Sequence, residues 1–226
     1  MGGLTRYPVP INFSSMLTQV SKRRGLVGSR RGTDVMGAAL AVLRREGPSG
    51  LVMRNVAAEA GVTATALYRH FDSKDALISA VVKETYHEFR QSLVAEVSTG
   101  NPGTWLRVGF DRFLRFGMEH PNYYRLLFIE PRSNRIDRYP DDFVKGKSAG
   151  FRHLRDAVKV CIEAGVLRGA PRDAPYIALT LYAHMHGLMT LYLGGRFPDD
   201  DQFERFFHES LERVITGLQA VGHAGG

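Results

Sequence analysis

Side chains able to bind DNA are gathered in one short stretch of the sequence, residues 54–74. The hydroxyls of Thr63 and Thr65 can donate a hydrogen bond to a phosphate or to a base edge. Arg69 can bind a guanine or a phosphate, and Arg54 can clamp the backbone. On a helix, the exposed face would consist of Thr63, Ala64, Thr65, Tyr68 and Arg69. The stretch therefore predicts a DNA contact, and ordinary exposed surface is the alternative.

Two short helices are predicted to position that face. Residues 53–60 favour a helix in which the small Ala57 lets a neighbouring helix come close. Gly61 suits the left-handed conformation of a sharp turn, Thr63 can cap the next helix, and Leu67 supplies its apolar contact. These residue types at this spacing form the helix-turn-helix pattern, which also occurs by chance in other helical proteins.

A supporting helix is predicted before this pair. Thr33 is a good N-cap with Asp34 in the first turn, and the helix should stop near Gly47 with Pro48 beyond it. Its apolar residues recur at helical spacing and form one face for packing on the next two helices, namely Val35, Ala38, Ala39, Val42 and Leu43.

Positive charge is concentrated in the first third of the chain. Residues 1–75 hold 11 Lys and Arg against 5 Asp and Glu, a net of +6, whereas the remainder has 19 against 18, a net of +1. This distribution indicates a nucleic-acid-binding end. Residues 1–32, which include Arg30 and Arg31, are either a disordered tail or a basic arm that reaches the phosphate backbone or the minor groove.

The rest of the chain predicts a larger helical body. Breaker residues separate expected helices, and residues 131–140 are polar and favour a loop. The last tail, 222–226, is rich in glycine and is expected to fray. The helices are expected at 74–97, 102–119, from Pro121 through 122–129, 141–164, 174–193 and 199–217.

Residues 56–77 resemble the TetR family of bacterial transcriptional regulators. The matching positions are Ala57, Ala60, Gly61, Val62, Thr63, Leu67, Tyr68, His70, Phe71, Ser73, Lys74 and Leu77. The resemblance covers about residues 33–80. It implies that Tyr68, His70 and Lys74 contact phosphates, the last at a helix N-terminus where free amides also favour anions.

The C-terminal part resembles, less closely, a TetR C-terminal domain with a Trp-His-Gly signature on its penultimate helix. Here the local sequence is Met185-His186-Gly187, so the tryptophan is absent and the subfamily is in doubt. Pairing of the last two long helices in a four-helix bundle would make a homodimer. The expected dimerisation residues are Gly187, Leu191, Phe203, Phe206, Phe207, Leu211 and Val214.

Aromatic and sulfur-containing side chains of the body could line a small-molecule cavity or could be ordinary core. The unknown effector would bind there and shift the protein away from its DNA-competent conformation. The candidate ligand-binding residues are Trp105, Phe110, Phe113, Tyr123, Tyr124, Phe128, Tyr182, Met185, His186 and Met189.

Other chemistries receive little support from the sequence. His184 and His186 are two apart on a helix and point about 200° from each other, so they cannot easily share a metal ion and are expected to be core histidines. No nucleophile motif, phosphate-binding glycine loop or cysteine pair is present. No catalytic residue, metal or cofactor is therefore expected. The single cysteine, Cys161, predicts a buried structural thiol and fits a reducing compartment.

The sequence thus predicts an all-α protein with an N-terminal three-helix helix-turn-helix DNA-binding domain (33–80) after the arm (1–32). A larger helical ligand-binding and dimerisation domain (81–221) follows. The expected function is a homodimeric, cytoplasmic bacterial repressor of a palindromic operator, released by a small molecule. Its two recognition helices would lie about 34 Å apart, one turn of DNA. A helical small-molecule carrier without DNA binding is the alternative, and an enzyme is a more distant one.

Overall fold

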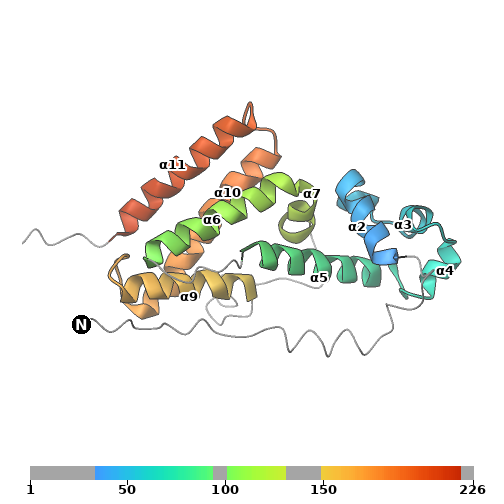
Figure 1. The fold of residues 1–226 in the computed structure, drawn as a ribbon, viewed down its shortest axis with the longest axis horizontal. Helices are drawn as coiled ribbons and strands as arrows, with labels where there is room; N and C mark the ends of the chain where they lie inside the picture. Colours follow the sequence, from blue (N-terminus) through green and yellow to red (C-terminus); the bar gives the residue numbers. More distant parts are fainter. Residues whose placement is uncertain (1–33, 94–100, 131–148, 220–226) are drawn as a thin grey trace, which may run out of the picture.

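The computed structural model describes residues 34–93, 101–130 and 149–219, and all its long elements are helices. Figure 1 shows a small group of helices at one end and a larger group at the other, joined by one long helix. Within the described ranges, β structure is limited to a single bridge between Leu167 and Gln219. No helix there is long and apolar enough to cross a membrane. The α-helical fold class predicted from the sequence is confirmed.

The head, as we name α2 to α4, contains α2 (Val35–Glu46), the short 3-10 turn η1 (Pro48–Gly50), α3 (Met53–Glu59) and α4 (Ala64–Tyr68). Asp34 is the N-cap of α2, because its carboxylate accepts from the N–H of Gly37 at 2.9 Å. The sequence prediction placed this cap one residue earlier, at Thr33, which lies outside the described residues. The small core of the head is built from fully buried Val42, Leu43, Leu51, Val56, Leu67 and Leu77.

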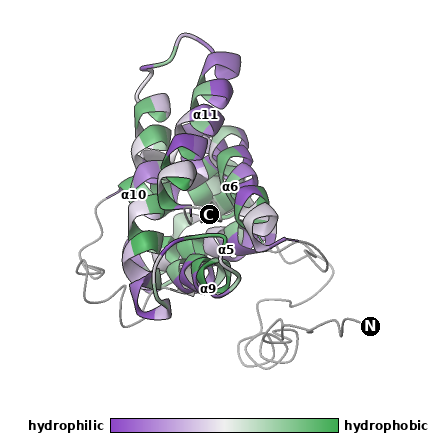
Figure 2. Cartoon of the chain, turned by 90° about the vertical axis from the view of Figure 1, so that its left-hand side faces the viewer, coloured by the Kyte–Doolittle hydropathy of each residue, from purple (hydrophilic) through white to green (hydrophobic). Residues whose placement is uncertain are grey.

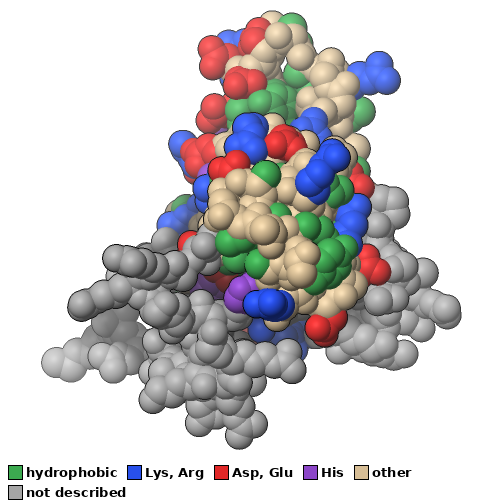
Figure 3. All heavy atoms as spheres, turned by 90° about the vertical axis from the view of Figure 1, so that its right-hand side faces the viewer, with side chains coloured by type: hydrophobic (Ala, Val, Ile, Leu, Met, Phe, Trp, Pro, Cys, Tyr) green, Lys and Arg blue, Asp and Glu red, His purple; other side chains and the backbone are tan. Residues whose placement is uncertain are grey.

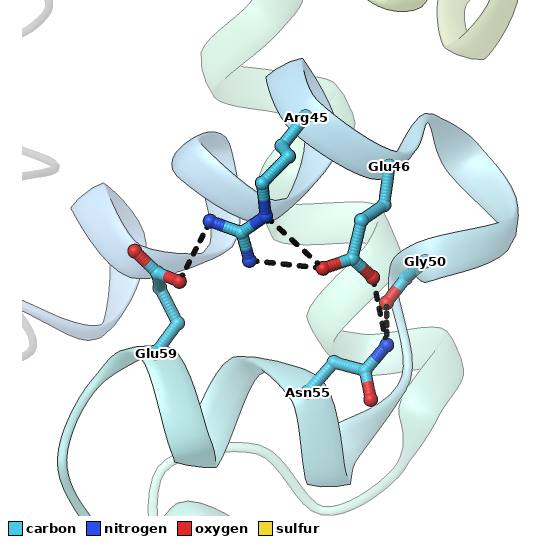
Figure 4. Close-up of polar contacts among 5 residues, drawn as sticks. All are labelled: Arg45, Glu46, Gly50, Asn55 and Glu59. Atoms are coloured by element: carbon cyan, nitrogen blue, oxygen red, sulfur yellow. Dashed lines mark hydrogen bonds and ion pairs between the residues drawn. The ribbon is translucent and has the colours of Figure 1, made fainter.

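A polar network fixes α2 against α3 (Figure 4). Arg45 bonds Glu46 on its own helix and Glu59 on α3, each at 2.9 Å. The amide of Asn55 donates to Glu46 at 2.9 Å and to the carbonyl of Gly50 at 3.2 Å. The guanidinium is more than half exposed, so each ion pair stabilises the fold only slightly. The network joins the end of α2 and the turn η1 to α3.

Helix α5 (Lys74–Leu93) runs from the head into the body. Ser73 caps it by accepting from the N–H of Ala76 at 3.1 Å, as its sequence predicts. The apolar residues of α5 divide between the two ends: Leu77 is buried in the head, whereas Phe89 packs on body residues Phe113, Phe116 and Phe128. The last predicted turn, 94–97, lies outside the described residues.

The body, as we name the helices after α5, contains α6 (Pro102–Glu119), α7 (Pro121–Tyr124), the π-turn η2 (Arg125–Ile129), α9 (Ala149–Glu163), α10 (Ala174–Leu193) and α11 (Asp200–Leu218). Figure 2 shows hydrophobic residues along the inner faces and hydrophilic ones on the outer turns of α11. Residues 131–148, where a loop and the start of a helix were predicted, lie outside the described residues. The spans predicted for α6 and α10 are confirmed.

Two close contacts hold the body helices together. Arg107 on α6 makes two bonds to Glu212 on α11, at 2.6 and 2.8 Å. A Cβ at Gly117 would come within 2.4 Å of the end of the Met189 side chain, so glycine leaves room for that side chain between α6 and α10. Cys161 is fully buried as predicted, and burial raises the pKa of its thiol to about 11. The thiol is therefore protonated and unreactive at neutral pH.

Candidate DNA-binding surface and ligand cavity

The recognition helix α4 is held in place by a cap, a glycine and a leucine. The hydroxyl oxygen of Thr63 accepts from the N–H of Ala66 at 3.1 Å. Gly61 has a φ of 66°, which lies in the left-handed region that favours glycine. Leu67 is fully buried in the head core. With Leu67 turned inward, the remaining side chains of this short helix are left for the surface.

The side chains predicted to bind DNA lie on that surface. Tyr68 is 52% exposed, which is unusual for a large aromatic side chain and suits a contact outside the protein. Lys74 is the first residue of α5, where unpaired amides favour a phosphate. The exposed members of the predicted set are Arg54, Thr63, Ala64, Thr65, Tyr68, Arg69, His70 and Lys74. Arg30 and Arg31 lie outside the described residues.

Figure 3 shows the head end of the molecule in space-filling form. Lys and Arg side chains, with several Asp and Glu among them, lie around the edge of this face, and neutral and hydrophobic surface fills its centre. Such an arrangement is suited to a duplex, because basic groups can reach the two phosphate backbones while the centre enters the groove.

The body encloses a cavity of about 210 Å³. Its walls come from α5, α6, η2, α9 and α10, so residues far apart in the sequence meet around one space. Seven of the ten residues predicted to bind a ligand line it. These are Trp105, Phe110, Phe113, Phe128, Tyr182, Met185 and His186.

The other three predicted ligand residues lie elsewhere. Met189 is fully buried against Gly117, where it fills the gap between α6 and α10. Tyr123 faces the head: its ring stacks on His120, and the guanidinium of Arg44 from α2 lies 5.5 Å from its centre. Tyr124 lines a neighbouring hollow, while its hydroxyl bonds His186 and its ring packs against the cavity residues Phe113 and Phe128. The adjacent residues Tyr123 and Tyr124 of α7 therefore face in different directions, the first toward the head and the second toward His186.

Several cavity residues were not predicted from the sequence. The end of α5 contributes Tyr86, Phe89 and Leu93, and α9 contributes Phe151 and Leu154 with others. The spacing of three and four residues along α5 marks an apolar stripe, which could have indicated a wall. Nothing in the sequence shows that α9 packs opposite that stripe.

His186 is the most enclosed polar group of the cavity. Four aromatic rings surround it, with centres 4.1 to 5.6 Å away: Phe113, Tyr124, Phe128 and Tyr182. Its Nδ1 is hydrogen-bonded to the hydroxyl of Tyr124. Burial lowers the pKa of His186 to about 3, so the imidazole is neutral at neutral pH. Burial also raises the pKa of Tyr124, whose hydroxyl keeps its proton.

The two histidines of α10 have separate surroundings. His184 lies 3.2 Å from the hydroxyl of Ser210 on α11, on the side away from the cavity. In the described part of the chain, the grouping with metal-ligand spacing is Asp111, Glu204 and His208, whose ligand atoms lie within 4.8 Å of one another. Arg115 already pairs with this aspartate at 3.1 Å. A solvated charge cluster accounts for the grouping.

The residues predicted for dimerisation fall into two groups. Phe203, Phe207 and Leu211 are buried within the protomer, where they pack α11 on the body, so they offer no surface to a partner. The sequence prediction assigned all apolar positions of α11 to one dimer face, although some of them face the core of the protomer. Leu191 and Phe206 are 47% and 43% exposed, Val214 is partly buried, and a Cβ added at Gly187 would meet nothing within 4 Å. Only this second group can face a partner.

A helix-turn-helix head on a helical body with an internal cavity defines a class of protein, the ligand-sensing DNA-binding regulators. Residues 35–81 match the family described as bacterial regulatory proteins, TetR family. Residues 106–214 match the tetracycline repressor-like C-terminal domain. Together the two matches span most of the chain, which belongs to the TetR family of bacterial regulators.

Solved structures share the fold. A protein of unknown function from Rhodococcus sp. RHA1 is 22% identical, with a TM-score of 0.64 over 84% of this chain and 96% of its own. A TetR variant from Acinetobacter baumannii AYE, in complex with minocycline, is 20% identical, with a TM-score of 0.55 over 84% and 96%. BioQ, bound to its double-stranded DNA operator, is 21% identical, with a TM-score of 0.54 over 81% and 94%.

Proposed function

We propose that this protein is a homodimeric transcriptional repressor that binds a palindromic operator and is released from it by a small molecule. The observation that carries this proposal is the course of α5. Its first residue, Lys74, lies beside the exposed recognition helix, and its last turns line the cavity. One continuous helix therefore joins a surface suited to DNA with a space suited to a ligand. Two solved relatives, one with an operator and one with minocycline, support the same pairing of roles.

Dimerisation through α10 and α11 is supported by an uncharged face on α10. This helix contains no Asp, Glu, Lys or Arg in 20 residues. Its exposed positions recur every three or four residues, which places them on one stripe: Tyr176, Thr180, Ala183, Gly187, Thr190 and Leu191. An exposed stripe of this kind is expected to be covered by a partner, and a second copy presents the same surface about a twofold axis.

The chemistry of the cavity wall favours sensing over catalysis. Its described lining has no carboxylate, lysine or arginine, and its one enclosed histidine is neutral and bonded to Tyr124. Such a wall can bind and orient a molecule, and its described residues include no carboxylate, lysine, serine or cysteine to pair with its histidines. We therefore assign the cavity to sensing.

The DNA-binding assignment is tested by a mobility-shift titration against the operator. Replacing both Tyr68 and Lys74 by Ala should weaken binding by about 100-fold and, because only Lys74 is charged, should reduce the salt dependence by about one counterion. Lys159→Ala, at an exposed site on α9, is the matched loss of one positive charge and should leave binding unchanged. Full affinity in the double variant, or binding that is insensitive to salt, would favour the helical carrier without DNA binding.

The dimer assignment is tested by sedimentation equilibrium. Leu191→Glu places a charge at an exposed position of the stripe and should shift the protein to monomers with an intact fold. Arg196→Glu, at an exposed position just after α10, is the control. A variant that remains dimeric would move the interface away from α10.

A further inference from the structure

Two buried nitrogen atoms in the cavity wall have no hydrogen-bond partner among the described residues. They are Nε1 of Trp105 on α6 and Nε2 of His186 on α10, and both side chains line the same space. Buried polar groups in folded proteins are nearly always bonded, because an unmade bond costs free energy. A molecule inside the cavity is the partner that could satisfy both.

The protonation of His186 decides what kind of partner it takes. Tyr124 is fully buried, and its hydroxyl has His186 Nδ1 as its hydrogen-bond partner in the described structure. The hydroxyl proton of Tyr124 needs an acceptor, so the phenol donates to Nδ1 of His186. Because the imidazole is neutral, its single proton then lies on Nε2. The indole nitrogen of Trp105 is also a donor and never an acceptor. Both unpartnered atoms therefore offer an N–H.

The two donors lie toward opposite ends of the cavity. Trp105 and Phe113 are eight residues apart on α6, a rise of about 12 Å along the helix axis. The ring of His186 is centred 5.0 Å from that of Phe113. Aromatic and aliphatic side chains, including Phe110 and Met185, line the space between. An occupant thus meets an N–H at one end, an apolar middle, and a second N–H at the other end.

The lining also limits the charge of the occupant. None of the described residues around the cavity is Asp, Glu, Lys or Arg. A charged molecule would lose its hydration there without gaining an opposite charge, which is strongly unfavourable. His153 also lines the cavity, and although the residue is exposed overall, burial lowers the pKa of its imidazole. An uncharged molecule is therefore favoured.

We propose that the cavity binds an uncharged, mainly apolar ring compound with a hydrogen-bond acceptor oxygen, such as a ketone, lactone or quinone, that receives the N–H of His186. A second acceptor at the far end of a longer ligand would receive the N–H of Trp105. The volume of about 210 Å³ suits one or two rings, since a cavity of about 150 Å³ holds benzene. The inference rests on the proposed ligand response and specifies its chemistry.

Isothermal titration calorimetry with three related probes tests the ligand class. 1-Tetralone carries the acceptor, tetralin has the same ring system without it, and tetralin-1-carboxylate adds a charge. With the unaltered protein, we expect 1-tetralone to bind about 10-fold more tightly than tetralin, and the carboxylate to bind most weakly. Equal binding of the first two, tightest binding of the carboxylate, or no binding of any probe would overturn the proposal.

Two substitutions on the same helix locate the acceptor contact. His186→Phe removes the N–H and should bring the affinities for 1-tetralone and tetralin within about twofold of each other. His184→Phe makes the same change on the side away from the cavity and should keep the roughly 10-fold preference. Preference retained in the first variant or lost in the second would place the acceptor elsewhere. The probe series on the unaltered protein remains decisive should His186→Phe not fold.

Failure of this inference can be told apart from failure of the proposed function. The same probes are added to the protein–operator complex in a mobility-shift assay. Release by tetralin or by the carboxylate in preference to 1-tetralone contradicts the ligand class and leaves a ligand-responsive repressor. A protein that binds 1-tetralone with the expected preference, but never binds an operator, supports the ligand class and contradicts the repressor.

Discussion

The head and the body carry their functional groups in opposite ways. In the head, Leu67 is fully buried and its neighbour Tyr68 is 52% exposed, so one short helix separates core side chains from candidate DNA-binding side chains. In the body, the candidate binding groups are themselves part of the interior, and His186 is enclosed by four aromatic rings. The surface site therefore depends on the orientation of one helix. The cavity depends on how five elements pack around a space that their side chains do not fill.

Substitution of the buried residue Leu67 on α4 gives the largest expected effect on stability. Leu67→Ala should lower the free energy of unfolding by about 2–5 kcal/mol, because it removes a fully buried side chain and leaves a void. Tyr68→Ala, one residue on, should change it by less than about 0.5 kcal/mol. Urea unfolding followed by circular dichroism measures both. Similar losses at the two positions would contradict the division of roles on α4.

The enclosure of His186 makes the body sensitive to acid. Its pKa is about 3 in the folded protein and about 6.5 when unfolded, so between these values the unfolded state binds the extra proton. The contribution of neutral His186 to the free energy of unfolding is therefore fully present above pH 6.5. It falls as the pH is lowered, by about 2 kcal/mol between pH 7 and pH 5. Urea titrations at both pH values, with His186→Phe, measure this.

In His186→Phe, that part of the pH dependence should disappear. The control is Thr65→Ala, at an exposed position of the head without a titratable group, which should keep the slope of the unaltered protein. A slope unchanged by His186→Phe would show that its ring takes up a proton in the folded state.

Two glycines sharpen the same comparison. Gly61 in the head has a φ of 66°, so Gly61→Ala should cost about 1–2 kcal/mol although a Cβ there would meet nothing within 4 Å. Gly187 in the body lies within helix α10 and has equally open space. Gly187→Ala should stabilise the protomer by up to about 1 kcal/mol through helix propensity. Thermal unfolding at low protein concentration, where the protein is monomeric, measures both variants. A loss of stability in Gly187→Ala would indicate that Gly187 makes a contact that the protomer alone does not contain.

The junction between head and body gives the smallest expected effect. The side-chain amide of Asn122 on α7 donates to the carbonyl of Arg44 on α2 at 2.9 Å. Asn122→Ala should cost about 1 kcal/mol, since the carbonyl can turn to water. The measurement is chemical unfolding monitored separately by the fluorescence of Trp105 and by far-ultraviolet circular dichroism. Coincident transitions indicate that the two parts still unfold together, and separate transitions would show that this bond joins them.

Most of the fold could be predicted from the sequence, and the head best of all. Its turn glycine, caps and apolar spacing are local signals, and each acts within a few residues of its position. The dimerisation set shows the limit: Phe203 and Phe206 lie on the same helix at helical spacing, yet one is buried in the protomer and the other is 43% exposed. Apolar periodicity marks a face without saying which neighbour covers it.

The cavity depended on longer-range packing. The aromatic and sulfur-containing residues of the body could be selected by type, but Tyr123 and Met189 share that type and lie outside the cavity. They pack instead against Arg44 and Gly117, which are distant from them in the sequence. The wall formed by α9 was missed for the same reason.

Under the proposed function, helix α5 acts as a lever between the cavity and the phosphate contact proposed for Lys74. Its 20 residues extend about 30 Å, with the cavity at one end and Lys74 at the other. If the helix pivots near the cavity, a tilt of about 5° displaces its far end by about 2.6 Å. A hydrogen bond tolerates only about half an ångström of stretch, so a motion too small to open the body is enough to disengage a phosphate contact. The displacement of the far end is proportional to the length of the helix. A shorter helix would need a larger tilt at the cavity to move the head by the same distance.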